Sequence, residues 1–197
     1  PWFGLAHSMG AAVALSASRR GRLPFARLVA LAPMIELALV RKPRLARGMA
    51  LGLWGLGLSR AWIPGGGATS IATKPFAGNR LTSDPVRYAR NADAASSIGA
   101  HAIGDPTVGW IRAAFAFMKG FAEPRAALEI HTPTLVIAAG ADPICATAAT
   151  ERFASRLKAG HAIVLPGARH EILMERDAIR ELFWAAFDAF VPGTPVP

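Results

Sequence analysis

The sequence of 197 residues predicts an α/β fold, in which helices flank a parallel β-sheet. Two short apolar runs without polar alternation, 134–139 and 162–165, are typical of strands buried on both faces of a parallel sheet. Each run ends at Gly and Pro residues and is followed by a helical pattern, which favours parallel pairing. A hydrophobic content of 52% supports a large core, and the length suits one domain with an insertion.

The elements can be placed in order along the chain. A short apolar strand leads into an alanine-rich helix that ends at Gly21, and the final helix is amphipathic, with apolar residues at i, i+3 and i+4 spacing. The expected strands are 2–6, 27–32, 134–139 and 162–165. The expected helices are 9–20, 46–61, 84–96, 107–121, 146–157 and 176–190.

Ser8 lies between the first strand and the first helix, in the sequence Ala6-His-Ser-Met-Gly10. Small residues two positions before and after a serine let a strand and a helix pass closely at a sharp turn, which exposes the serine as a nucleophile. The usual pattern is Gly-x-Ser-x-Gly, so Ala6 departs from it and Gly10 fits it. The pentapeptide alone suits a serine that caps a helix equally well. We expect His7 to face away from the pocket.

A serine nucleophile needs a base within hydrogen-bonding reach, and the base needs an orienting acid. In folds with this turn the acid and then the histidine follow later strands. Asp142 follows the strand 134–139, and His170 follows the strand 162–165. Alone, Asp142 suits a turn or a helix cap and His170 an ordinary loop position. Together, three residues just past the carboxyl ends of parallel strands favour a triad of Ser8, His170 and Asp142.

These stretches resemble the α/β-hydrolase superfamily, and within it the bacterial lysophospholipase and monoacylglycerol-lipase-like hydrolases, also called the serine aminopeptidase-like group. The most specific matches are His7-Ser-Met-Gly10 and Arg169-His-Glu171, and further matches are 79–84, 106–110, 139–143 and 172–175. The resemblance implies an α/β-hydrolase fold and the same triad. It fixes no substrate, because the group includes carboxylesterases and lipases as well as lysophospholipases. The departures at Ala6 and Ala11 remove no chemical group.

Members of this superfamily carry several strands before the nucleophile turn, and a loop there normally supplies one of two oxyanion N–H donors. This sequence begins at Pro1 with the strand that leads to Ser8. We therefore expect a C-terminal fragment that lacks the N-terminal strands and that is poorly soluble or inactive alone. The other oxyanion donor would be the backbone N–H of Met9.

The segment 34–125 is too long for an ordinary connection between strands. We predict that it is a helical cap or lid, inserted into a core formed by 1–33 and 126–197. A cap of this kind excludes water and shapes the acyl pocket.

Apolar residues and tryptophans crowd the stretch 51–63, directly after the basic stretch 41–47. A basic edge beside an apolar face suits peripheral contact with an anionic membrane, and the alternative is a cap helix packed on the core with solvated basic flanks. The apolar run 48–59 is too short to cross a bilayer. The residues expected to bind substrate in the cap are Trp54, Trp62 and Trp110.

The formal net charge of +9 does not indicate nucleic-acid binding, because the basic residues are scattered and form no tract interleaved with aromatics. The single Cys145 cannot form an internal disulfide and reads as a small core residue. We expect a cytoplasmic bacterial protein, or one peripheral at the inner membrane.

No cofactor is expected, and no metal, since no His, Cys and Asp set has metal-ligand spacing. Glu171 and Glu175 read as the start of the final helix, where carboxylates are favoured by the helix dipole. Asp105 and Glu123 are alternative acids, and both fall within the predicted cap.

The sequence therefore predicts a serine hydrolase that cleaves carboxylic esters, above all lysophospholipid or monoacylglycerol-type lipids, through an acyl-enzyme. Two alternatives remain: another triad chemistry, such as amide, thioester or carbon–carbon hydrolysis, and a non-catalytic pseudo-hydrolase scaffold. Epoxide hydrolase and dehalogenase chemistry are disfavoured, because they require a carboxylate at the position of Ser8.

Overall fold

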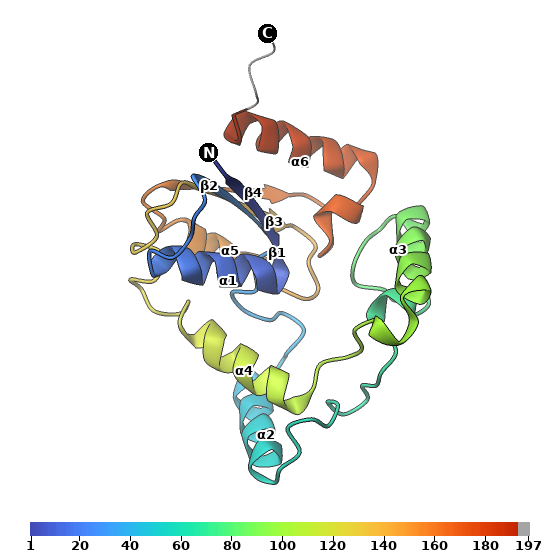
Figure 1. The fold of residues 1–197 in the computed structure, drawn as a ribbon. Coiled ribbons are helices and arrows are strands. Elements are labelled where there is room, and N and C mark those ends of the chain that lie inside the picture. The colour runs from blue at the N-terminus through green and yellow to red at the C-terminus, as the bar shows by residue number, and fades with distance from the viewer. Residues whose placement is uncertain (193–197) are drawn as a thin grey trace. The chain divides into compact units, whose positions relative to one another are not determined.

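The computed structural model describes residues 1–192, apart from the side chain of Ala100, and contains a parallel sheet (Figure 1). The four strands are hydrogen-bonded in the order β1-β2-β3-β4, and each neighbouring pair is parallel. The predicted α/β architecture is confirmed. The strands are β1 (Phe3–His7), β2 (Arg27–Leu31), β3 (Thr134–Ala139) and β4 (Gly160–Leu165).

Six α-helices and three short 3₁₀-helices accompany these strands in the described part of the chain. The α-helices are α1 (Ser8–Arg19), α2 (Pro43–Gly55), α3 (Pro85–Ser97), α4 (Val108–Lys119), α5 (Thr147–Ala154) and α6 (Asp177–Phe190). The 3₁₀-helices are η1 (Ile71–Thr73), η2 (Gly99–His101) and η3 (Ile172–Met174).

The helix expected over 46–61 has different ends. It begins at Pro43, whose fixed φ and missing N–H suit the first turn of a helix. It ends at Gly55 because the chain then turns at Gly57, which takes a φ of 80°.

Helices cover both faces of the sheet, with α1 and α5 on one face and α6 on the other (Figure 1). The α6 side is a continuous core in which Phe183 is fully buried against Val29, Leu31 and Ile137. All six residues of β3 are buried, which explains the absence of polar alternation in this strand. The sheet therefore holds the ends of its strands in fixed positions.

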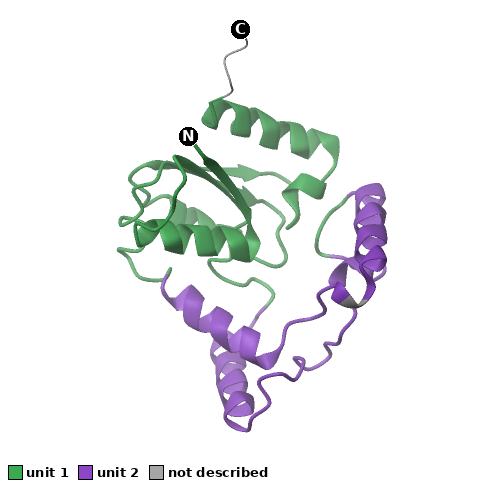
Figure 2. Cartoon of the chain, viewed as in Figure 1, with its two compact units in different colours: residues 1–39, 80–83, 121–197 green, residues 40–79, 84–120 purple. Residues whose placement is uncertain are grey.

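The chain divides into two compact units (Figure 2). Unit 1 comprises residues 1–39, 80–83 and 121–197 and contains the sheet, and unit 2 comprises 40–79 and 84–120. The predicted insertion, 34–125, contains all of unit 2 together with short flanking and central stretches of unit 1. The residues 80–83 are notable, because they join unit 1 although the chain on both sides belongs to unit 2.

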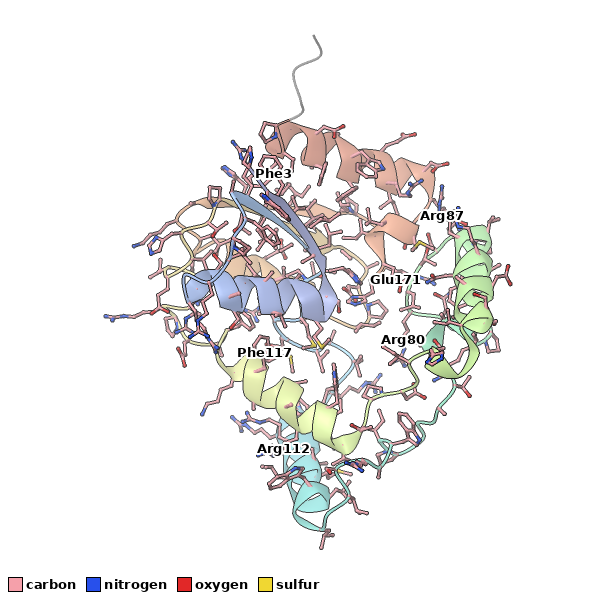
Figure 3. The ribbon with its side chains drawn as sticks, in the orientation of Figure 1. Phe3, Arg80, Arg87, Arg112, Phe117 and Glu171 are labelled. Atoms are coloured by element: carbon pink, nitrogen blue, oxygen red, sulfur yellow. The ribbon has the colours of Figure 1, made fainter. Side chains whose placement is uncertain are left out.

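Within unit 2, α2 packs against α4, and the guanidinium of Arg112 lies 4.0 Å from the centre of the Trp54 ring (Figure 3). Lys74 binds both carboxylate oxygens of Asp105, at 2.8 and 2.9 Å, and the Gly67 N–H donates to the same carboxylate. The Lys74 ammonium is the main cause of a lowered pKa at Asp105. Among the described residues, no helix is both long enough and apolar enough to cross a bilayer.

Candidate active site

Ser8 is the first residue of α1 and directly follows His7, the last residue of β1. Its φ of 52° is left-handed, a conformation that costs an L-residue roughly 1–2 kcal/mol. The strand must turn sharply here to enter the helix, and the turn places Ser8 at the carboxyl edge of the sheet. Gly10 was expected to allow close packing beside Ser8, but a Cβ at Gly10 would meet no described atom within 4 Å. Close packing occurs at Gly4 instead, where a Cβ would lie 2.4 Å from the Phe25 ring.

The structure brings the three predicted residues together in one series of hydrogen bonds. Ser8 Oγ lies 2.8 Å from His170 Nε2, and His170 Nδ1 lies 2.8 Å from Asp142 Oδ2. Because a carboxylate only accepts, Nδ1 carries the proton, and Nε2 is then free to accept from the Ser8 hydroxyl. The side chains of His170 and Asp142 are only 6% and 2% exposed, so water competes little for these bonds.

The loop after β3 fixes the Asp142 carboxylate. Its Oδ1 accepts the backbone N–H groups of Ile144, at 2.8 Å, and Cys145, at 3.0 Å, which leaves Oδ2 for the histidine. Gly140 allows the loop to lie against β4, because a Cβ there would come 2.8 Å from the carbonyl oxygen of Leu165. The aspartate is therefore oriented by its own turn, as an Asx-turn does.

His7 does not face away from the site, and that expectation was wrong. Its ring centre lies 4.7 Å from that of His170, and its Nε2 lies 2.9 Å from the His170 carbonyl oxygen. Burial is the main cause of a lowered pKa at His7, and the neighbouring His170 lowers it further. His7 is thus a neutral ring packed against the base.

Glu171 and Glu175 also differ from their predicted role. The final helix begins at Asp177, and η3 lies between the two glutamates. Burial raises the pKa of Glu171. Glu175 is 0% exposed and accepts the backbone N–H of Arg169, so it belongs to the histidine loop rather than to the helix. No local pattern in the sequence distinguishes this buried carboxylate from a solvated one.

The alternative acids are engaged elsewhere. Asp105 binds Lys74 within unit 2, and Glu123 forms a 2.9 Å ion pair with Arg19 within unit 1.

Cys145, predicted as a small core residue, is buried and lies beside the triad. One ligand atom each of Cys145, Asp142 and His170 lie within 4.8 Å of one another, a set that could surround a metal ion. The residues fit a resident metal poorly, because the imidazole and the carboxylate already bind each other and Ser8 occupies Nε2. Burial, and then the Asp142 carboxylate, raise the pKa of the thiol to about 12, whereas metals bind the thiolate.

The remaining predicted site residues are the Met9 N–H and three tryptophans. Met9 follows Ser8 in the first turn of α1, where backbone N–H groups have no acceptor within the helix. Trp54, Trp62 and Trp110 all lie in unit 2 and are 46%, 42% and 37% exposed.

A hollow of about 600 Å³ lies away from the triad, between α6 and the amino ends of the strands. Arg27, Pro133 and Ala159 are among its lining residues, and they precede or begin β2, β3 and β4. Ligands of open α/β sheets bind at the opposite, carboxyl edge, where Ser8 lies.

A serine on a strand-to-helix turn, with an acid and a histidine after later strands of a parallel sheet, defines the α/β-hydrolase fold. The family model described as serine aminopeptidase, S33, matches residues 1–177, and the chain belongs to this family.

Known proteins show the same relationship. The chain is 34% identical over 115 residues to lysophospholipase L2 of Escherichia coli K12, an alignment that covers 55% of this chain and 33% of that protein. Two solved structures share the fold. A soluble variant of monoglyceride lipase from Saccharomyces cerevisiae has a TM-score of 0.72 and 18% identity, over 98% of this chain and 64% of that one. A carboxyl esterase from Bacillus coagulans has a TM-score of 0.69 and 18% identity, over 96% and 64%.

The chain thus spans about a third of the length of the curated relative and under two thirds of the length of these solved structures.

Proposed function

We propose that this protein is a serine hydrolase that cleaves carboxylic esters of lipids through an acyl-enzyme. The observation that carries the proposal is a pair of hydrogen bonds at His170. Its Nε2 lies 2.8 Å from Ser8 Oγ, and its Nδ1 lies 2.8 Å from Asp142 Oδ2. This is the geometry that general-base activation of a serine requires.

In the proposed reaction, His170 Nε2 takes the Ser8 hydroxyl proton while Oγ attacks the ester carbonyl. The Met9 N–H donates to the oxyanion, and removal of one such donor typically costs about a hundredfold or more in turnover. His170 then gives its proton to the leaving alcohol, which leaves an acyl group on Ser8. In the second half of the reaction His170 takes a proton from water, the water attacks the acyl carbonyl, and His170 returns the proton to Ser8 Oγ as the acid is released. Asp142 keeps His170 in the productive tautomer and stabilises the imidazolium.

Lysophospholipids and monoacylglycerol-type lipids are the proposed substrates. The names of relatives support this class, since they include a lysophospholipase, a monoglyceride lipase and a carboxyl esterase. Trp54, Trp62 and Trp110 are proposed to contact the acyl chain, because they are partly exposed aromatic side chains of the predicted cap.

A membrane surface is the proposed partner, because one stretch of the predicted cap carries positive charge without acidic residues. No Asp or Glu lies between Glu36 and Asp84, whereas this stretch holds seven Lys and Arg residues. Large apolar side chains are exposed in the same stretch, among them Leu45 at 58%, Leu51 at 54% and Leu56 at 77%. Exposed basic and apolar groups together favour binding to anionic lipid.

The test is labelling of the whole protein, as its gene encodes it, with a fluorophosphonate probe that reacts with activated serines. We expect mass spectrometry to find the label on Ser8 and expect Ser8→Ala to remove it. Labelling of a folded Ser8→Ala variant at the wild-type level would contradict the proposal. No labelling of the folded wild type would favour a pseudo-hydrolase scaffold.

A substrate panel then separates ester hydrolysis from the other triad chemistries. Lysophosphatidylcholine and monoacylglycerol are compared with amides and thioesters of the same acyl chain. Faster turnover of an amide or thioester than of the matched ester would overturn the substrate assignment while leaving the role of Ser8 intact.

A further inference from the structure

Glu175 is a fully buried carboxylate that takes no part in the proposed reaction. It follows η3 directly, and its side chain is 0% exposed. Burial of a carboxylate is unfavourable unless hydrogen bonds replace its water. Here the Arg169 N–H donates to Oε1 at 2.8 Å, and the Ser83 N–H lies 3.1 Å from each carboxylate oxygen. The Ser83 hydroxyl donates to Oε2 as well.

These bonds hold the backbone of the loop that carries His170, directly beside that residue. The peptide N–H just before His170, that of Arg169, donates to Glu175. The His170 carbonyl accepts from His7 at 2.9 Å, and the N–H of the residue after His170 donates to the Leu81 carbonyl at 2.8 Å. Three consecutive residues are therefore held in place, and the contacts to Glu175 and His7 are among those that depend on side chains.

The histidine loop is bonded to the short stretch 80–83. This stretch belongs to unit 1, although the residues before and after it in the sequence belong to unit 2. Thr82 is 0% exposed, and its hydroxyl donates to the Met174 carbonyl at 2.6 Å. The Arg169 guanidinium donates to the Thr82 carbonyl at 3.1 Å. Residues 81–83 and 169–175 are thus joined along their length, and the Glu175 side chain binds backbone N–H groups in both.

We propose that Glu175 is a positioning residue, whose carboxylate fixes the backbone N–H of Arg169, the residue before His170, so that the imidazole meets Ser8 at hydrogen-bonding distance. The inference rests on the proposed function, because it assigns Glu175 a role through His170. A displacement of about 1 Å in a reacting group can cost about a hundredfold in rate. Loss of the carboxylate therefore slows the reaction of Ser8 as well as loosening the fold.

The test compares second-order rates of fluorophosphonate labelling at Ser8 in the whole protein. Glu175→Met keeps the length of the side chain and removes both acceptors, and labelling is expected to slow by about tenfold or more. Glu175→Gln keeps a carbonyl for the Arg169 N–H and an amide that can donate to the Ser83 hydroxyl. It is expected to label within about threefold of the wild-type rate.

The matched control is Thr82→Val, which removes a buried hydrogen bond from the same contact without touching the peptide before His170. It is expected to lower thermal stability and to leave the labelling rate of the folded protein unchanged. The proposal is overturned if folded Glu175→Met labels at the wild-type rate, or if Thr82→Val slows labelling as much. If Glu175→Met does not fold, Glu175→Asp replaces it, because a shorter carboxylate cannot span both donors, and a wild-type rate there is equally contradictory.

A second readout is independent of activity. The proton on His170 Nδ1, bonded to Asp142, should give a downfield proton NMR signal. We expect this signal to be kept in Thr82→Val and Glu175→Gln and to broaden or move in the Met or Asp variant. An unchanged signal there refutes the positioning role, whereas a wild type that shows the signal but never labels refutes the proposed function instead.

Discussion

The imidazole of His7 is packed against that of His170 and hydrogen-bonded to its backbone. The ring centres are 4.7 Å apart, and the planes are tilted by 55°. Because a carbonyl oxygen only accepts, His7 Nε2 must carry the proton in its 2.9 Å bond to the His170 oxygen. The residue before the nucleophile thus supports the loop that carries the base.

This contact makes stability depend on pH. The pKa of His7 in the folded chain is lowered from 6.5, by burial first and by His170 second. The unfolded chain therefore binds a proton at His7 more readily, and stability falls as the pH drops below about 6.5. His7→Phe keeps a ring and cannot titrate, so its unfolding free energy should be lower by about 1 kcal/mol at pH 8 and less dependent on pH below 6.5.

Urea unfolding between pH 5 and 8 measures both effects. His131 is an exposed histidine of unit 1, and His131→Gln is the control for the loss of a histidine away from the triad. Parallel curves for wild type and His7→Phe would contradict the prediction.

Asp142→Asn should separate orientation from folding. The asparagine Oδ1 still accepts from Ile144 and Cys145, so the turn is preserved and stability changes little. Its amide donates where Oδ2 accepted, which forces the wrong tautomer of His170, and turnover of an ester should fall by about 10⁴-fold. Steady-state kinetics of the folded variant give the answer, and a loss below about tenfold would argue against Asp142 as the orienting acid.

Much of the fold and the triad could be predicted from sequence because the order of parallel strands fixes where the residues after them lie. The carboxyl ends of parallel strands share one edge of a sheet, so residues just after β1, β3 and β4 must gather there once the strands are recognised. The strand β3 could be predicted because every residue in it is apolar or small, and the structure buries all of them.

What could not be predicted depends on contacts between distant segments. His7 contacts His170, 163 residues further along the chain, and strand periodicity shows which face of a sheet a side chain takes but not which distant segment packs there. Glu175 is buried because Ser83, far away in the sequence, supplies donors for it.

Ser8→Gly should be more stable than Ser8→Ala. Glycine adopts a φ near 52° without strain, whereas alanine keeps the Cβ that makes this conformation costly. Both variants lose the hydroxyl contact with His170, so the difference between their unfolding free energies reports the backbone strain at position 8. We expect Ser8→Gly to exceed Ser8→Ala in unfolding free energy by about 1 kcal/mol, after the entropy that glycine gains in the unfolded chain. A Gly variant less stable than the Ala variant, measured by denaturant unfolding, would show that the turn is unstrained.

Cys145 should resist alkylation until the chain unfolds. Its side chain is 2% exposed, and a pKa of about 12 leaves almost no thiolate at pH 8. Iodoacetamide at pH 8 should modify the native protein at least a hundredfold more slowly than the protein in urea, as followed by intact mass. Equal rates would mean that the loop after Asp142 opens freely.

Removal of charge before and within α2 should weaken binding to anionic vesicles. Arg41, Arg44 and Arg47 are exposed, and each basic residue near such a surface contributes about 1 kcal/mol. Their joint replacement by Gln should therefore reduce the partition coefficient by roughly a hundredfold on vesicles that contain phosphatidylglycerol. Neutral phosphatidylcholine vesicles should bind wild type and variant alike, and added salt should narrow the difference between them.

Three exposed arginines of unit 1 provide a control with the same change in net charge, namely Arg125, Arg152 and Arg156. Replacement of these by Gln should leave vesicle binding near the wild-type value if the attraction is local to the 41–47 stretch. An equal loss in both triple variants would show that net charge alone draws the protein to the membrane. No loss in either would leave the exposed leucines and tryptophans as the only part of the proposed surface that could bind lipid, and the basic stretch would then be ordinary solvated charge.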